Sequence, residues 1–92
     1  MNHALKTWPE YFRAIANGSK TFEIRKADRP FAVGDTLVLR EFDPETGEYT
    51  EFVLCRTITY ILNGGQFGIE SGYVVLGLTE DYDFFKLTPL NL

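Results

Sequence analysis

The sequence predicts a mainly β domain with one helix, an α+β fold in which the strands form a small closed or nearly closed barrel and the helix lies across one opening. Three observations support this fold class. One amphipathic helical segment lies near the N-terminus, every later segment has the pattern of a strand, and 92 residues suffice for a single hydrophobic core. An early helix followed by about five mostly antiparallel strands is typical of small barrels.

The N-terminal segments are a short strand and the helix. Residues 3–6 alternate in the manner of a strand, and residues 8–17 form the predicted helix. Thr7 and Glu10 have the spacing of a capping box at its start, and Gly18 follows its end as the expected left-handed terminating residue. The apolar stripe of this helix consists of Trp8, Tyr11, Phe12 and Ile15.

Beyond the helix, the chain consists of strand-like segments separated by turns that contain glycine or proline. The predicted strands are residues 21–25, 36–42, 49–62 and 73–78. The third of these is long enough to require a bend or a bulge, and the fourth is almost wholly apolar, which indicates a central strand. The predicted core includes Phe22, Ile24, Leu37, Leu39, Val53, Ile58, Val74 and Leu76.

Residues 1–78 are expected to form the barrel domain, and residues 79–92 an acidic, aromatic tail. The tail is interpreted as an appendage that packs on the barrel. Truncation after Leu78 is therefore expected to leave a folded domain.

Composition and charge exclude several classes of protein. A formal charge of −4 argues against a sequence-independent binder of extended duplex DNA. No apolar run approaches the roughly 20 residues of a membrane span, and the N-terminus lacks the apolar core of a signal peptide, so we expect a cytoplasmic protein without a membrane partner. A single cysteine excludes an internal disulfide, and no cysteine–histidine cluster indicates a metal site, so no metal or cofactor is expected.

The charge is distributed unevenly along the chain. Residues 1–40 carry seven basic and four acidic side chains, whereas residues 41–92 carry two basic and nine acidic ones. A basic half on an acidic protein favours a local pocket for an anion over an extended track for a nucleic acid.

The strand at residues 21–25 gathers much of the positive charge. Because side chains alternate along a strand, its two apolar side chains are expected to face the core, with Lys20 at the mouth of the same face. Glu23 and Arg25 then share the opposite face and can form a lateral ion pair. Two interpretations remain open: a solvated sheet edge with an ion pair worth less than about 1 kcal/mol, or a site for an anionic ligand.

Residues 18–25 have the pattern G-x-K-x-x-E-x-R, and residues 33–35 follow as a V-G-D turn. Together with the preceding helix, this order resembles the ASCH family of the PUA-like superfamily. The further patterns H-x-L-K, W-P-E-Y-F and Y-I-L-x-G-G-x-F-G look like one small bacterial and phage branch of that superfamily. The resemblance covers about residues 3–78 and leaves the tail outside.

The resemblance implies a β-barrel with a cleft between helix and barrel, lined by the charged residues of the motif. Related domains bind RNA or nucleotides. One ASCH-type enzyme group hydrolyses the acetamide of N4-acetylcytidine nucleosides with a lysine, a threonine and a glutamate. Lys20 matches that lysine, Glu23 stands where the enzymes have threonine, and Glu70 is the only candidate for the glutamate. The missing threonine argues against amide hydrolysis, and Arg25 matches an arginine taken as structural or anion-binding.

Further candidates lie outside the charged strand. His3 and Lys6 would reach the cleft if the first strand lies beside residues 21–25; alternatively, His3 belongs to a disordered N-terminus. Arg29 either extends the cationic rim or lies in a turn. Trp8 either fixes the helix to the barrel or stacks on a base.

Three functions from different classes remain open. The first is a binding module for RNA, a nucleotide or a modified nucleoside, which fits the charge asymmetry and the glutamate at position 23. The second is a hydrolase of such a ligand, either an amidohydrolase or a ribonuclease, with Lys20 and Glu23 as catalytic residues. The third is a protein-binding accessory factor acting through the tail residues Tyr82, Phe84 and Phe85. The predicted ligand-binding residues are His3, Lys6, Lys20, Glu23, Arg25 and Arg29.

Overall fold

The computed structural model describes residues 1–79 and 88–89, which form one helix and six strands. The elements in chain order are β1 (Asn2–Thr7), α1 (Pro9–Ala16), β2 (Phe22–Lys26), β3 (Thr36–Asp43), β4 (Glu48–Asn63), β5 (Tyr73–Leu78) and β6 (Thr88–Pro89). The predicted class, mainly β with one helix, is confirmed. Within the described part of the chain, no helix is both long and apolar enough to span a membrane.

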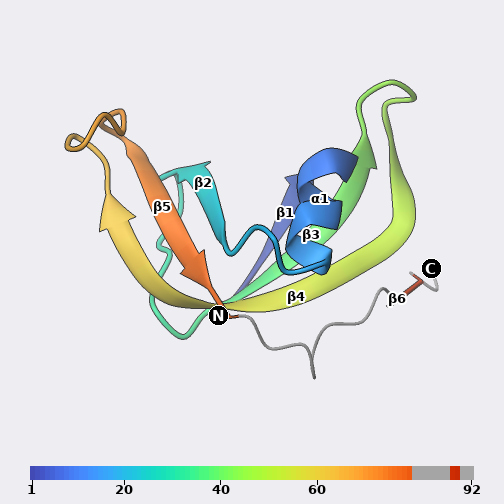
Figure 1. The fold of residues 1–92 in the computed structure, drawn as a ribbon, viewed down its shortest axis with the longest axis horizontal. Helices are drawn as coiled ribbons and strands as arrows, with labels where there is room; N and C mark the ends of the chain where they lie inside the picture. The colour runs from blue at the N-terminus through green and yellow to red at the C-terminus, as the bar shows by residue number, and fades with distance from the viewer. Residues whose placement is uncertain (80–87, 90–92) are drawn as a thin grey trace.

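The strands form one sheet in the order β1-β3-β4-β5-β2, with β6 paired to β4. β1 runs parallel to β3, and the remaining pairs are antiparallel. β4 belongs to both halves of the sheet: its first part pairs with β3 and its last part with β5, with a register shift between Ile58 and Tyr60. Figure 1 shows the result, in which β4 runs along the base and the two halves of the sheet rise on either side of it. The predicted bulge in the long strand is thus confirmed.

The sheet is not closed, so the barrel that was expected to be closed or nearly closed is not confirmed. β1 and β2 are the two ends of the strand order, and no ladder joins them among the described residues. Arginine side chains bridge the opening instead. Arg25 Nη2 donates a hydrogen bond to the carbonyl of Lys6 at 2.9 Å, and Arg29 Nη1 donates one to the carbonyl of Ala4 at 3.4 Å. These contacts satisfy carbonyls at the free edge of β1 that a neighbouring strand would otherwise pair.

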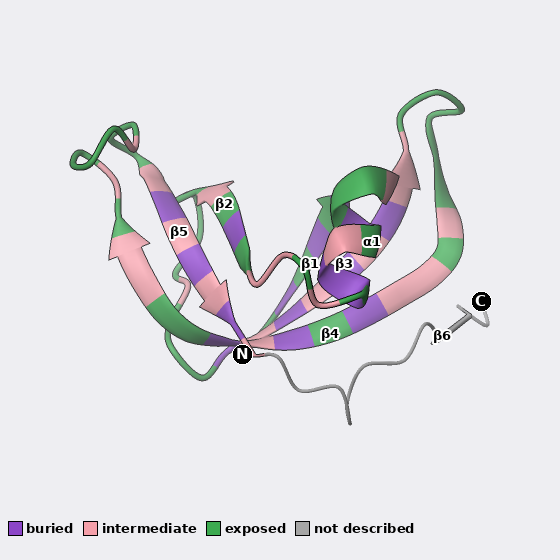
Figure 2. Ribbon diagram, in the orientation of Figure 1, coloured by how far each residue is buried: buried purple, intermediate pink, exposed green. Residues whose placement is uncertain are grey.

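The core lies between α1 and the inner face of the sheet (Figure 2). Phe12 and Ile15 of the helix are each 1% exposed and form one cluster with Leu37 and Leu39 of β3, which are fully buried. The remaining core residues are Leu5, Ala16, Leu54, Ile58, Val74, Leu76 and Leu78. Burying large apolar side chains of this kind contributes about 1.5–3 kcal/mol each, so this cluster fixes how α1 sits against β3.

The orientation of β2 is the main correction to the predicted core. Phe22 and Ile24 are 42% and 49% exposed, whereas Glu23 between them is 4% exposed. The alternation along the strand holds, but the inward face is the charged one, because Glu23 is neutralised there by basic neighbours. Val53 was also predicted in the core; it is only partly buried, and Leu54 next to it takes the core position.

The start of the helix differs from the prediction, and its end agrees. Trp8 is the N-cap residue and makes no side-chain capping bond. Thr7, predicted as the cap, is instead the last residue of β1, where its side chain is buried. Gly18 has φ of 85° and donates its N–H to the carbonyl of Ile15, as expected for a glycine that ends a helix.

The predicted tail lies largely outside the described residues. Thr79 is the last residue described before the gap, and Thr88 and Pro89 pair with Val53 and Phe52 of β4. Tyr82, Phe84 and Phe85, on which the accessory-factor hypothesis depends, are outside the described ranges. The division at residue 78 therefore stays a prediction.

Candidate functional site

An open cleft of about 560 Å³ lies between α1, β2 and the end of β1. Three sequence segments meet there because the helix turns directly out of β1 and the chain returns through Gly18 into β2. The backbone N–H of Lys20 donates to the carbonyl of Ala14, which fixes the returning chain against the helix. The residues that line the cleft are Lys6, Thr7, Trp8, Tyr11, Lys20, Phe22, Glu23, Ile24 and Arg25.

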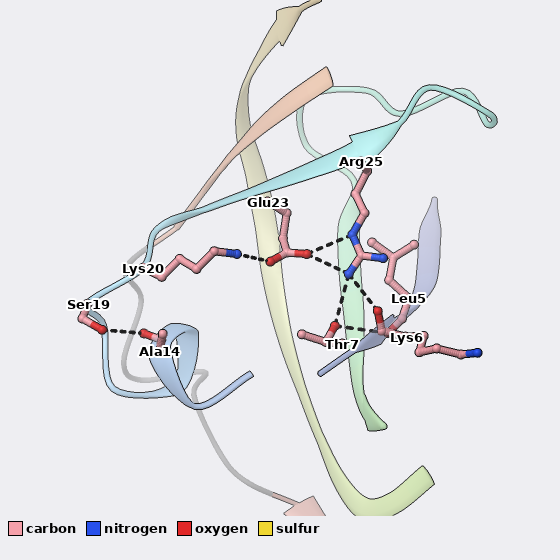
Figure 3. A network of polar contacts seen from close by, with 8 residues as sticks. All are labelled: Leu5, Lys6, Thr7, Ala14, Ser19, Lys20, Glu23 and Arg25. Carbon is pink, nitrogen blue, oxygen red and sulfur yellow. Dashed lines mark hydrogen bonds and ion pairs between the residues drawn. The ribbon is translucent and has the colours of Figure 1, made fainter. Parts of the chain in front are cut away.

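Glu23 is the central polar residue of the cleft, and two cations hold its carboxylate. Lys20 Nζ donates to Oε2, while Arg25 approaches Oε1 with Nε at 2.9 Å and Nη2 at 2.7 Å. Figure 3 shows the two basic side chains reaching the carboxylate from opposite sides. The side chain of Glu23 is 5% exposed, against 19% for Lys20 and 23% for Arg25, so the carboxylate is the deepest charge.

Arg25 also connects the cleft to β1. Its Nη2 donates to the carbonyl of Lys6 and lies 3.3 Å from Thr7 Oγ1. The Thr7 hydroxyl donates in turn to the carbonyl of Leu5 at 3.5 Å. The guanidinium is therefore held by a carboxylate on one side and by the edge of β1 on the other, which leaves it little rotational freedom.

Aromatic rings form the walls above this charged floor. Lys20 Nζ lies 5.4 Å from the ring centre of Tyr11 and 5.0 Å from that of Phe22, distances at which a cation is attracted to a ring face. Trp8, at the mouth, is 51% exposed. Exposure of three large aromatic side chains around one polar group is unusual for a solvated sheet edge, because such rings are normally buried or bound to a partner.

The charges of the floor do not cancel. Two cations share one buried carboxylate, so an excess positive charge remains at the bottom of an apolar opening. The lysine ammonium has three N–H donors and the glutamate carboxylate about four lone-pair sites, and both residues line the cleft. The arrangement can therefore offer both donors and an acceptor to a planar polar ligand.

The structure brings four of the six predicted ligand-binding residues to the cleft: Lys6, Lys20, Glu23 and Arg25. Lys6 contributes its main chain, because its ammonium group lies 4.2 Å over the ring of Phe42 and points away from Arg25 in Figure 3. Glu70, the weakest catalytic candidate, is exposed and does not line the cleft.

His3 and Arg29 are the two predicted residues that the structure places elsewhere. His3 is 3% exposed, and its Nε2 lies 2.8 Å from Asp35 Oδ2. Asp35 also accepts hydrogen bonds from the N-terminal amine at 3.2 Å and from the backbone N–H of Ala32 at 3.0 Å. The hydrogen bond from His3 is the largest cause that lowers the pKa of Asp35, and the other two act in the same direction. Arg29 lines a second, smaller cavity.

Four cleft residues were missed by sequence reasoning: Phe22 and Ile24 were assigned to the core, and Thr7 and Tyr11 were given other roles. Thr7 was interpreted as a helix cap, and Tyr11 as part of the buried helix stripe. Tyr11 is 44% exposed, because a stripe that contains Trp8, Tyr11, Phe12 and Ile15 is wider than the surface that β3 covers. The width of this apolar stripe could therefore have indicated that part of it lies outside the core. Among the described residues, no group of three or more histidine, cysteine, aspartate or glutamate side chains can hold a metal ion.

The solved structures that share this fold include two variants of ZmASCH from Zymomonas mobilis. The first, a serine-to-alanine variant, is 17% identical with a TM-score of 0.63, over 96% of this chain and 70% of that chain. The second, a tyrosine-to-phenylalanine variant, is 20% identical with a TM-score of 0.66, over 99% of this chain and 76% of that chain. The chain thus shares the fold of these ZmASCH structures.

No curated protein matches the sequence. A family model does match it, over residues 2–78, which include β1 to β5 and every residue of the cleft. The chain belongs to that family, which is described as a domain of unknown function, DUF3850.

Proposed function

We propose that the cleft binds one unpaired nucleobase, presented by a nucleotide, a modified nucleoside or single-stranded RNA. The observation that carries this proposal is a buried carboxylate held by two cations at the bottom of an aromatic-walled cleft of about 560 Å³. That volume lies within the usual range of small-ligand sites, about 300–1,000 Å³.

Each part of the cleft matches one property of a base. The rings of Trp8, Tyr11 and Phe22 offer faces for stacking, which contributes about 1–3 kcal/mol per base. The polar edge of a base carries both carbonyl acceptors and amino donors. The Lys20 ammonium can donate to the former, and the Glu23 carboxylate can accept from the latter.

The G-x-K-x-x-E-x-R motif at residues 18–25 accounts for this arrangement, and we propose that it is the ligand-binding motif of the ASCH fold in this family. Gly18 permits the left-handed turn at the end of α1. The next residues carry Lys20 to the cleft, and the strand alternation places Glu23 and Arg25 on one face.

The hydrogen bond that Lys20 makes favours a binding function over hydrolysis. A lysine acts as a nucleophile or base only through a neutral amine with a free lone pair. Here its Nζ donates a charge-assisted hydrogen bond directly to the buried Glu23 carboxylate. We therefore assign Lys20 as a hydrogen-bond donor to the ligand. Hydrolysis of an amide or a phosphodiester is the second candidate function, and it would require an activated water molecule as the nucleophile in place of Lys20.

The charge pattern also sets the size of the ligand. The cleft is a local cationic feature on a chain with a net charge of −4, so a long polyanion is repelled outside the site. We expect one or two phosphate contacts. Each neutralised phosphate of a single strand contributes about −0.7 to the slope of log K against log salt, so the slope should lie between about −0.7 and −1.4.

Calorimetric titration with nucleosides, nucleotides and short single-stranded RNAs tests the proposal. Lys20→Ala should weaken binding by about 1–3 kcal/mol, because a charged hydrogen bond is lost. Arg40→Ala is the matched control, since Arg40 is a cation outside the cleft that stacks on Tyr49. Equal affinity of wild type and Lys20→Ala, or a salt slope near −5, would contradict the proposal. Release of a hydrolysis product during the titration would identify an enzyme instead.

A further inference from the structure

A second cavity, of about 130 Å³, lies next to the cleft in the opening between β1 and β2. It is lined by Leu5, Arg25, Lys26, Asp28, Arg29 and Phe31. Three of these side chains are cations and one is a carboxylate. Since a single water occupies roughly 30 Å³, the cavity has room for several water-sized groups, comparable to the oxygens of one phosphate.

Arg25 lines both cavities and separates them. Its Nε and Nη2 atoms are engaged by Glu23 and by β1, whereas its Nη1 atom has no hydrogen-bond partner among the described residues. In Figure 3, Nη1 lies on the side of the guanidinium away from Glu23. Arg25 and Leu5 both line the smaller cavity. One donor of the motif arginine is thus free toward the second cavity.

Arg29 also lines the smaller cavity, and only part of its N–H donors are engaged by residues that the structure describes. Its Nη1 donates to the carbonyl of Ala4 at 3.4 Å, and its Nε lies 3.7 Å from Asp28 Oδ1. The Asp28 side chain is 63% exposed, so solvent weakens this ion pair. The guanidinium carbon of Arg29 lies over the ring of Phe31, 5.8 Å from its centre. Lys26 has no carboxylate partner in the described part of the chain.

We propose that the smaller cavity is a phosphate subsite, which takes the phosphate ester of the ligand whose base occupies the cleft; the inference rests on the function proposed above. Guanidinium groups bind phosphate oxygens through paired N–H donors, which favours phosphate over a single carboxylate oxygen. The shared wall at Arg25 means that one nucleotide can occupy both cavities, with Lys26 and Arg29 reading only the phosphate. The subsite thus predicts that the protein distinguishes a nucleotide from its nucleoside.

The test compares a nucleoside with its 5′- and 3′-monophosphates by calorimetry. For the wild type, one of the monophosphates should bind at least about tenfold more tightly than the nucleoside, since charged hydrogen bonds are added. Arg29→Ala and Lys26→Ala should each remove most of that advantage and leave nucleoside affinity unchanged, and Arg29→Lys, which keeps the charge, should recover part of it. Arg40→Ala is the control and should preserve it. Equal binding of nucleoside and both monophosphates, or an advantage that survives in both alanine variants, would overturn the proposal.

Inorganic phosphate separates this inference from the proposed function. If no nucleoside or nucleotide binds, the function of the cleft is wrong, but the subsite is still tested by NMR titration with millimolar phosphate. Saturable shifts of the Arg29 side-chain N–H, absent with chloride at equal ionic strength, would support the subsite. Shifts that do not saturate would contradict it. Thermal unfolding of each variant checks that the loss of the Arg29 contact with Ala4 has not unfolded the edge of β1.

Discussion

Two of the buried carboxylates, Glu23 and Asp35, are each held by two basic groups but lie in different settings. Glu23 is held by Lys20 and Arg25 at the floor of an open cleft. Asp35 is held by His3 and the N-terminal amine at the junction of β1 and β3, where the histidine ring lies 4.7 Å from that of Phe31. Both anions have two basic neighbours, but only Glu23 lines a cavity of ligand size.

The difference teaches what distinguishes a structural ion cluster from a candidate site. Asp35 uses its lone pairs within the protein. Its side chain accepts from three groups, among them His3 of β1, and its backbone bonds to the turn at residues 32–35 and to β4. Glu23, Lys20 and Arg25 also bond to one another, but all three line the cleft. A buried charge pair that is internally complete contributes to stability, whereas one that remains incomplete is available for a ligand.

Among the charged residues of the two clusters, the largest expected effect on stability is that of removing Glu23. Glu23→Ala leaves two cations without their carboxylate, and breaking such a buried arrangement costs about 3 kcal/mol in the free energy of unfolding. Urea denaturation measures this value, with Glu10→Ala on the exposed side of α1 as the control. A change below about 0.5 kcal/mol would show that the cluster contributes little to folding.

Lys20→Ala tests whether the ion pairs around Glu23 serve ligand binding more than stability. Its effect on stability should be small, because Arg25 remains to neutralise Glu23, whereas affinity for the base ligand falls by about 1–3 kcal/mol. The same protein sample provides both measurements, by urea denaturation and by calorimetry. A large loss of stability with unchanged affinity would contradict this prediction. It would show that Lys20, Glu23 and Arg25 stabilise the fold, as Asp35 and its partners do, and do not bind a ligand.

The pH dependence of stability tests the Asp35 cluster. Because the pKa of Asp35 is lowered in the folded state, its stabilisation is fully present above the unfolded-state value of about 3.9 and is lost as the pH falls through the folded-state pKa. Wild type should therefore be more stable than Asp35→Asn at pH 7, and the difference should narrow below about pH 4. Asp28→Asn, in which the altered side chain is mostly exposed, should show no such narrowing. A difference that stays constant from pH 7 to pH 3 would contradict this role.

The smallest expected change in stability concerns Ile24, whose side chain borders the Glu23 cluster. Because it is 49% exposed, Ile24→Thr should alter the free energy of unfolding by less than about 0.5 kcal/mol. Leu76→Ala, at a fully buried position of the neighbouring strand, should cost about 2–5 kcal/mol and serves as the contrast. If Ile24→Thr costs as much as Leu76→Ala, the outward orientation of this residue is wrong.

The sequence was sufficient for the elements that local patterns determine. Gly18 marks the end of α1, Gly47 closes the turn between β3 and β4 with φ of 74°, and the apolar run of β5 lies between two strands as expected. These features depend on residues close together in the chain. For the same reason, the alternation of β2 was predicted correctly even though its inward face was not.

The rest depends on contacts between distant residues. Hydrophobicity alone assigned Phe22 to the core, because nothing local shows that β2 faces a cleft rather than a packed interior. His3 and Asp35 are 32 positions apart, and only the parallel pairing of β1 with β3 brings them together. The open edge between β1 and β2, with Arg25 in place of a ladder, is likewise a property of the assembled sheet.

The fluorescence of Trp8 tests the central claim, that a base binds in the cleft, most directly. It is the single tryptophan of the chain and stands at the mouth of the cleft, 51% exposed. Titration with nucleoside monophosphates should quench it saturably in wild type and in Arg40→Ala, with clearly weaker affinity in Lys20→Ala. A fluorescence signal that does not saturate with any base, or that saturates equally in all three proteins, would contradict the assignment of the cleft as the binding site.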